Sequence, residues 1–173
     1  DSLELQVGAR YSAAKTTNHV DVLQYGAPIA ADQSASFRDW SGKVSLNWTV
    51  DPHNFLYAFV ATGFRPGGLN VPVGFGQPAP FDAEKVTSLE AGWKAGFFDG
   101  RLRTQIDAYY NHYENFQVII GYPTLPIFGF ELNTPNPTVI YGFEAQAEAR
   151  FGAFSLDAGL GIMHSEIGKF FAT

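Results

Sequence analysis

Two carboxylates, Glu144 and Glu148, are spaced so that both would fall on the same face of a β-strand. Carboxylate pairs carry out acid–base chemistry in glycosidases, which makes sugar hydrolysis the first activity to consider. The surrounding sequence supplies no partner pattern that would build a cleft. The pair is more simply explained as part of a polar strand face, and we expect no enzymatic activity.

The histidines do not have the spacing of a metal site. No HExxH or similar motif occurs, and His53 follows Pro52 in what is most simply a turn. The serines form no GxSxG motif, and no glycine-rich phosphate-binding loop is present. We therefore expect no catalytic, cofactor-binding or metal-binding residue and no cofactor. The histidines are His19, His53, His112 and His164.

The composition fits neither an ordinary soluble domain nor a helical membrane protein. Charged residues make up 16% of the 173 residues, against about 25% in soluble domains. No run of about 18 apolar residues is present, and the mean hydropathy is −0.07. Such intermediate values are typical of a transmembrane β-barrel, whose lipid-facing and lumen-facing residues alternate. The net charge of −6 argues against a nucleic-acid partner, and the lack of cysteine excludes disulfides.

Alternation with a period of two dominates the sequence and predicts an all-β protein of seven antiparallel strands. Short connections at 52–53, 99–100 and 152–153 separate them at one end, and loops of about twenty residues at the other. This asymmetry matches the periplasmic and extracellular ends of an outer-membrane barrel. The expected strands lie near 3–15, 38–50, 55–64, 86–98, 101–118, 138–151 and 154–166, and the long loops near 16–37, 65–85 and 119–137.

The short turns fix a register that can be tested against side-chain polarity. Asp99-Gly100 suits a type I′ turn and Gly152-Ala153 a type II′ turn. Pairing outward from either turn collects apolar residues on one face and polar residues on the other. The polar face could contact a plug or the solute, although a solvated wall explains it more simply. Its members are Glu90, Lys94, Arg103, Gln105, Asp107, Glu144, Gln146, Glu148, Arg150 and Asp157.

The third hairpin sorts its side chains less cleanly. The segment 51–54 suits a type I turn with Asp51 first and Pro52 second. Pairing outward sets Val50 against Phe55 and Trp48 against Tyr57 on the apolar face. The second strand is apolar on both sides, so polarity checks this register only weakly.

Two features favour a membrane barrel over a soluble β-sandwich. The middle of the apolar face is mostly alanine, which suits a lipid-facing wall better than a core that needs large interlocking side chains. Aromatic residues gather near both ends of that face, as interfacial girdles do. The girdle near the short turns comprises Trp48, Phe55, Phe97, Phe151 and Phe154, and the girdle near the long loops Tyr110, Tyr141, Phe143 and Trp40.

An ordered set of motifs resembles TonB-dependent receptors. Residues 56–68 (LYAFVATGFRPGG), followed by Asn70, are similar to the family stretch LYASYATGFRPGG-N. The remaining motifs are 85–94 (KVTSLEAGWK), 97–102 (FFDGRL), 108–110 (AYY), 116–117 (FQ) and 141–144 (YGFE). The resemblance covers about 38–166 in the family's order and spacing. Within 63–68 we interpret the glycines and Pro66 as shaping the strand's exit into a loop rather than as a ligand contact.

The resemblance implies that residues 1–173 are part of a barrel of 22 strands with a plugged lumen, in the outer membrane of a Gram-negative bacterium. It implies active uptake of a scarce nutrient, powered by a TonB-type complex that pulls on the plug. No plug, TonB-contacting segment or closing strand is found in these residues, so we expect this chain alone to be unable to transport.

An iron–siderophore complex is the first expectation for the imported nutrient, because it is the family's commonest cargo. Carbohydrate or cobalamin uptake stays open, as does a soluble β-sandwich binding module. The loops 65–85 and 119–137 offer aromatic contacts that suit catecholates and sugars equally. The aromatic and proline residues of the second loop include Tyr122, Pro123, Phe128 and Phe130.

Overall fold

The computed structural model describes residues 2–24, 26–71, 79–122 and 125–169, and in this part of the chain the secondary structure is entirely β. No helix among these residues is long and apolar enough to cross a membrane. The strands are β1 (Ser2–Gln24), β2 (Ala27–Asp51), β3 (Asn54–Arg65), β4 (Glu84–Phe97), β5 (Leu102–Glu114), β6 (Gln117–Tyr122), β7 (Leu125–Asn133), β8 (Thr138–Phe151) and β9 (Phe154–Glu166).

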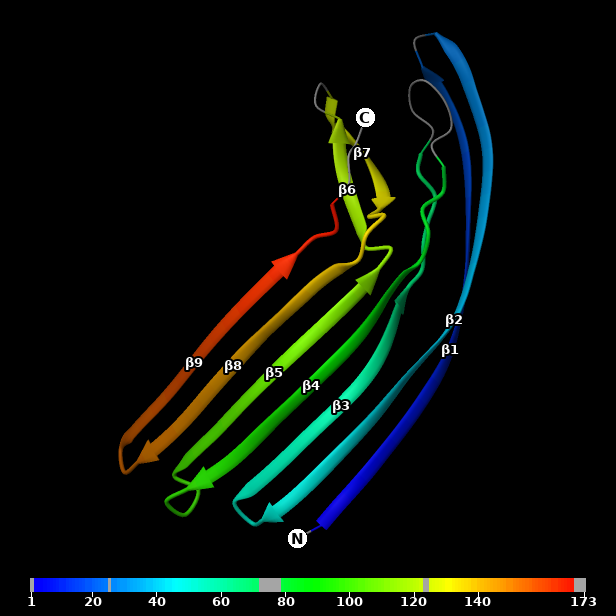
Figure 1. Cartoon of the computed structure of the whole chain (residues 1–173). Helices are drawn as coiled ribbons and strands as arrows, with labels where there is room; N and C mark the ends of the chain where they lie inside the picture. Colours follow the sequence, from blue (N-terminus) through cyan, green and yellow to red (C-terminus); the bar gives the residue numbers. More distant parts are fainter. Residues whose placement is uncertain (1, 25, 72–78, 123–124, 170–173) are drawn as a thin grey trace.

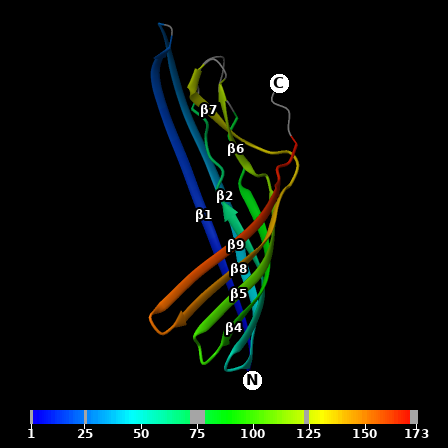
Figure 2. The same cartoon turned by 90° about the vertical axis from the view of Figure 1, so that its left-hand side faces the viewer.

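Seven strands form one antiparallel sheet in the order β1-β2-β3-β4-β5-β8-β9, and β6 and β7 pair separately as a hairpin. Each strand of the sheet therefore lies beside its neighbour in sequence, except that the β6–β7 hairpin is inserted between β5 and β8. The short turns gather at one end of the sheet and the long connections at the other, as predicted (Figure 1). A view turned by 90° shows that the sheet is twisted and curved (Figure 2).

Two of the three predicted hairpin registers are confirmed. Trp93 pairs with Ile106 around the first turn, where Asp99 and Gly100 have the positive φ values (57° and 79°) of a type I′ turn. At the second turn Phe151 pairs with Phe154. There Gly152 has a φ of 62° and Ala153 does not have a positive φ, as a type II′ turn requires. Local turn chemistry is sufficient to set these registers.

The predicted register of the β2–β3 hairpin is wrong by one residue. Thr49, not Val50, pairs with Phe55, because the ladder shifts between Thr49 and Asp51. Such a bulge adds a residue to one strand and moves every later side chain of the partner to the opposite face. Trp48 consequently pairs with Leu56, while Phe55 joins the polar face opposite Lys94.

The long connections contain more strand than predicted. Residues 16–37 were expected to be a loop, but the β1–β2 ladder continues to Gln24 and Ala27, and this hairpin extends far beyond the other strands of the seven-stranded sheet (Figure 1). The expected strand 101–118 is interrupted at Asn115, whose φ is 53°. The expected loop 119–137 contains most of the β6–β7 hairpin. Only 65–85 lacks a strand over most of its described residues.

The seven-stranded sheet is a single layer, which rules out the soluble β-sandwich. A sandwich packs two sheets face to face over a shared core. Among the described residues only Val20, Ala31 and Ala95 are buried hydrophobics. The outer edges of β1 and β9 pair with no other described strand. An apolar face open to its surroundings and two open edges are the properties of an incomplete barrel wall.

Aromatic side chains lie exposed near both ends of the apolar face. Trp48, Phe97, Phe151 and Phe154 are exposed near the short turns, and Trp40, Tyr110, Tyr141 and Phe143 near the long connections. In the second group the rings of Tyr110 and Tyr141 stack with centroids 6.4 Å apart. Apart from Phe55, which the bulge places on the other face, the two expected girdles are confirmed.

Candidate functional site

The predicted polar face is confirmed as one continuous wall. Its rows run across the sheet: Lys94 lies opposite Gln105, and Gln105 lies opposite Gln146. One row nearer the short turns, Arg103 is opposite Glu148, which is opposite Asp157. The register places all ten predicted residues on this face: Glu90, Lys94, Arg103, Gln105, Asp107, Glu144, Gln146, Glu148, Arg150 and Asp157.

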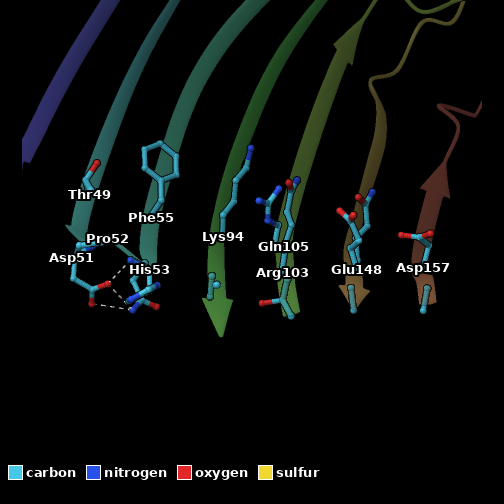
Figure 3. Close-up of a pocket in the computed structure, with 18 residues that line it drawn as sticks. Thr49, Asp51, Pro52, His53, Phe55, Lys94, Arg103, Gln105, Glu148 and Asp157 are labelled. Carbon is cyan, nitrogen blue, oxygen red and sulfur yellow. Dashed lines mark hydrogen bonds between the residues drawn. The ribbon is translucent and has the colours of Figure 1, made fainter. Parts of the chain in front are cut away.

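The wall is hollowed near the short turns. A concavity of about 750 Å³ lies there, with side chains from β2, β3, β4, β5, β8 and β9 around it (Figure 3). Its lining is mixed in charge, and Glu148 forms an ion pair with Arg150 of the same strand. The lining includes Thr49, His53, Phe55, Lys94, Arg103, Gln105, Gln146, Glu148 and Asp157.

The turn that borders this hollow is held by Asp51. Its carboxylate accepts a hydrogen bond of 2.7 Å from the backbone N–H of His53 and two from the side-chain amide of Asn54. The bond from the His53 N–H, followed by those from Asn54, holds the pKa of the Asp51 carboxyl below its ordinary value. His53 is therefore a turn residue, as the sequence indicates.

The aromatic part of the polar face was missed by the sequence analysis. Tyr57 donates a hydrogen bond of 2.8 Å to Glu90, and Lys43 lies 4.0 Å from the centre of the Phe59 ring. Lys94 lies over the Tyr57 ring at 5.5 Å from its centre. The only signal available beforehand was that β3 is apolar on both sides, so that one of its faces had to lie on the polar wall.

The residues considered first for chemistry do not assemble into a catalytic or metal site. Glu144 and Glu148 lie four residues apart on one strand, about 13 Å at 3.3 Å per residue. Glycosidase carboxyls lie about 5–9.5 Å apart. Across the described residues, no group of three or more His, Asp and Glu side chains could hold a metal ion. His19 instead contacts Asp32 at 2.6 Å on the exposed β1–β2 hairpin.

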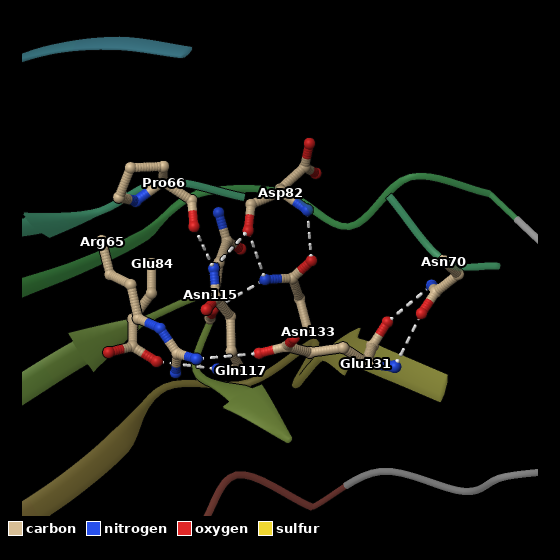
Figure 4. A network of polar contacts seen from close by, with 9 residues as sticks. All are labelled: Arg65, Pro66, Asn70, Asp82, Glu84, Asn115, Gln117, Glu131 and Asn133. Carbon is tan, nitrogen blue, oxygen red and sulfur yellow. Dashed lines mark hydrogen bonds and ion pairs between the residues drawn. The ribbon is translucent and has the colours of Figure 1, made fainter. Parts of the chain in front are cut away.

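A second polar cluster lies at the opposite end, where the long connections meet (Figure 4). Here β3 leaves the sheet at Arg65. Gly68 and Phe81 then exchange two backbone hydrogen bonds of 3.1 Å that close the base of the following connection. Side-chain amides bind this base to the β6–β7 hairpin. The cluster comprises Arg65, Asn70, Asp82, Glu84, Asn115, Gln117, Glu131 and Asn133.

The glycines lie where the chain leaves the sheet, as predicted, and there they permit close packing. Neither Gly67 nor Gly68 has a positive φ. A Cβ on Gly67 would lie 2.2 Å from the carbonyl oxygen of Phe81, and a Cβ on Gly68 would lie 2.4 Å from the Phe81 ring. Pro66 does follow the last residue of β3, as expected for a residue that ends a ladder.

The ligand-facing aromatics predicted in 119–137 are only partly described. Pro123 lies outside the described residues, and so do the side chains of Tyr122 and Phe128. Phe130 lies half-buried on β7. Contact between these aromatics and a ligand stays a prediction.

Sequence comparison identifies the family of this wall. A family model described as "TonB dependent receptor-like, beta-barrel" matches residues 1–167. The chain belongs to the TonB-dependent receptor β-barrel family. The pesticin receptor of Yersinia pestis is 26% identical over 168 residues, which cover 96% of this chain and 24% of that receptor. The chain thus spans about a quarter of the length of this relative.

Solved structures share the same architecture. The ferric yersiniabactin uptake receptor FyuA of Yersinia pestis superposes with a TM-score of 0.79 at 23% identity, covering 95% of this chain and 24% of FyuA. The copper transporter OprC superposes with a TM-score of 0.76 at 19% identity, covering 95% of this chain and 27% of OprC. At these identities the likeness concerns the fold. The family is one of outer-membrane receptors, so the apolar face of the sheet faces outer-membrane lipid.

Proposed function

We propose that this chain is part of the barrel wall of an outer-membrane receptor that imports an iron–siderophore complex with energy from a TonB-type complex. The family match over residues 1–167 carries the proposal. The relatives support the choice of cargo: they include receptors for ferric yersiniabactin and alcaligin and the siderophore receptor PiuA. The short turns then face the periplasm and the long connections face the medium.

The polar wall fits the inside of such a barrel. Its hollow near the short turns is lined by both signs of charge. We propose that a plug domain occupies the lumen against this surface and links the receptor to the energising complex. The long connections, with aromatic residues such as Phe81 near their base, are placed to meet a ligand arriving from outside.

Copper uptake is the second candidate, because the copper transporter OprC has the same fold. The two are separated by deleting the whole receptor gene in its source bacterium. Growth with a ferric siderophore as the only iron source, and accumulation of copper, are then measured in the same strain. We expect siderophore-dependent growth to be lost and to return with the intact gene on a plasmid. Unchanged siderophore use in the deletion strain would overturn the proposal, and loss of copper accumulation alone would establish the second candidate.

A further inference from the structure

Four side-chain amides of the cluster at the long-loop end bind backbone rather than one another. Asn115 donates to the Ala83 carbonyl oxygen at 3.5 Å, and the other three, Asn70, Gln117 and Asn133, form shorter hydrogen bonds. Asn70 lies in the 66–83 connection, whereas Gln117 and Asn133 are paired with each other at the base of the β6–β7 hairpin. Asn70 and Gln117 are 5% and 6% exposed. A buried primary amide presents both a donor and an acceptor, as a peptide group does, and is costly to bury unless its donors are used.

Asn70 and Asn133 each imitate a strand neighbour. Asn70 donates to the carbonyl oxygen of Glu131 at 2.9 Å and accepts from the backbone N–H of the same residue at 2.8 Å. Asn133 accepts from the backbone N–H of Asp82 at 2.6 Å and donates to the Asp82 carbonyl oxygen at 2.9 Å. The two segments thus bind each other reciprocally. The Asn70 side chain of the 66–83 connection binds the backbone of β7, and the Asn133 side chain at the end of β7 binds the backbone of the connection.

Gln117 joins the two ends of the connection at its base. Its side-chain nitrogen donates to the carbonyl oxygens of Pro66 at 3.0 Å and Asp82 at 3.1 Å, while its backbone N–H donates to Glu84 at 2.8 Å. Both side-chain partners are acceptors, so only an NH₂ group can fill this position. An ion pair of 3.0 Å between Arg65 and Glu131 adds a contact on the exposed side.

We propose that these three amides lock the described parts of the 66–83 connection and the β6–β7 hairpin into one rigid unit. The stretch containing Asn70 and the pair ending in Gln117 were singled out by their sequence, and the lock gives both a physical role. This role rests on the proposed function. The amides are then positioning residues, which hold the two loops in a fixed arrangement around an incoming ligand.

The test replaces the Gln117 amide by an isosteric carboxylate, Gln117→Glu, in the whole receptor reconstituted in lipid nanodiscs. The change removes both donors and faces two carbonyl oxygens with a negative oxygen. Backbone hydrogen exchange is followed without ligand in peptides covering 79–84 and 128–133, which contain the locked N–H groups of Asp82 and Glu131. We expect exchange in both peptides to accelerate by at least about tenfold and by similar factors.

Asn47→Asp is the matched control. It makes the same amide-to-carboxylate change on the polar face of β2, where Asn47 is half-buried and its side chain makes no hydrogen bond with the described residues. Exchange in the two peptides should stay unchanged in this variant. Acceleration of one peptide alone, or of neither, in Gln117→Glu would show that the loops are not locked together.

Two further measurements cover a variant that fails to assemble. Asn133→Asp removes the side-chain donor of the hairpin to the Asp82 carbonyl oxygen and should accelerate hydrogen exchange in both peptides by similar factors. In the unmodified receptor, the exchange rates of the two peptides should keep a constant ratio as urea is raised, whereas divergence would overturn the proposal. Growth on a ferric siderophore tests the proposed function, and hydrogen exchange tests the lock. Either proposal can therefore be overturned without the other.

Discussion

A cation placed on the lipid face of β8 should destabilise the barrel far more than the same cation one residue away. Ala145 lies on the apolar face between Ile106 of β5 and Leu160 of β9. Gln146, the next residue, lies on the polar face opposite Gln105. The substitutions Ala145→Arg and Gln146→Arg therefore add the same side chain to opposite faces at nearly the same depth.

The girdles on β8 give the depth of Ala145. Phe151 and Tyr141 are ten residues apart (151 − 141), which is about 33 Å along a strand. At a tilt of about 40° this corresponds to about 25 Å along the membrane normal, the height of the apolar band in outer-membrane barrels. Ala145 is six residues from Phe151 and four from Tyr141, so it lies within about 3 Å of the midplane. An arginine there costs about 2–4 kcal/mol.

The assay is urea unfolding of the whole receptor in phospholipid vesicles, followed by the mobility shift of the folded barrel on gels. Ala145→Arg should lower the free energy of unfolding by about 2–4 kcal/mol, and Gln146→Arg by less than about 1 kcal/mol. Ala145→Leu should leave it unchanged or raise it, because a larger apolar side chain gains contact with lipid. If Gln146→Arg costs as much as Ala145→Arg, the assignment of the two faces is wrong.

Three further predictions concern packing and titration. Gly142→Ala should cost about 1–3 kcal/mol of unfolding free energy, because its Cβ would lie 2.6 Å from a backbone oxygen, whereas Gly96→Ala has no contact closer than 4.0 Å and should cost less than about 1 kcal/mol. The pKa of Asp51 is lowered mainly by the hydrogen bond from the His53 N–H. Its ionised carboxylate therefore stabilises the fold fully above the ordinary pKa of 3.8, and this contribution is lost as the pH falls through the lowered pKa. Denaturation midpoints of the unmodified receptor and of Asp51→Ala, compared between pH 2 and 7, measure the contribution. His19, whose pKa is raised mainly by the hydrogen bond with Asp32, should stabilise the β1–β2 hairpin fully below pH 6.5 and lose this effect as the pH rises through the raised pKa, as hydrogen exchange of residues 17–23 reports.

Each of these predictions has an outcome that contradicts it. Equal costs for the two glycine substitutions would mean that the close approach at Gly142 is relieved by backbone movement. A midpoint difference for Asp51→Ala that does not shrink toward low pH would assign the role of Asp51 to something other than its charge. If hydrogen exchange in the β1–β2 hairpin depends on pH identically in His19→Gln and in the unmodified receptor, the His19–Asp32 pair is not the cause of that pH dependence.

Much of the fold could be predicted because its causes are local. Alternation sorts side chains wherever one face meets lipid, and the turns at Asp99-Gly100 and Gly152-Ala153 set the register within two residues. Where both faces of a hairpin are exposed, nothing requires alternation. Beyond residue 16 most side chains of β1–β2 are exposed and many cross-strand pairs are polar, such as His19 with Asp32. Val20 and Ala31 are the buried exceptions, and so weak an alternation led to the prediction of a loop.

The sequence by itself determined the all-β class, the placement of short turns at one end of the sheet and long connections at the other, the polar wall and the family. Only the tertiary structure decided the face of β3, because a bulge at Val50 depends on how β2 fits between two neighbours. The hydrogen bonds between the long connections were likewise decided only by the tertiary structure. Asn70, Gln117 and Asn133 bind backbone groups that lie far from them in sequence. A backbone acceptor has no side-chain signature, so its partner becomes visible only when folding brings the two segments together.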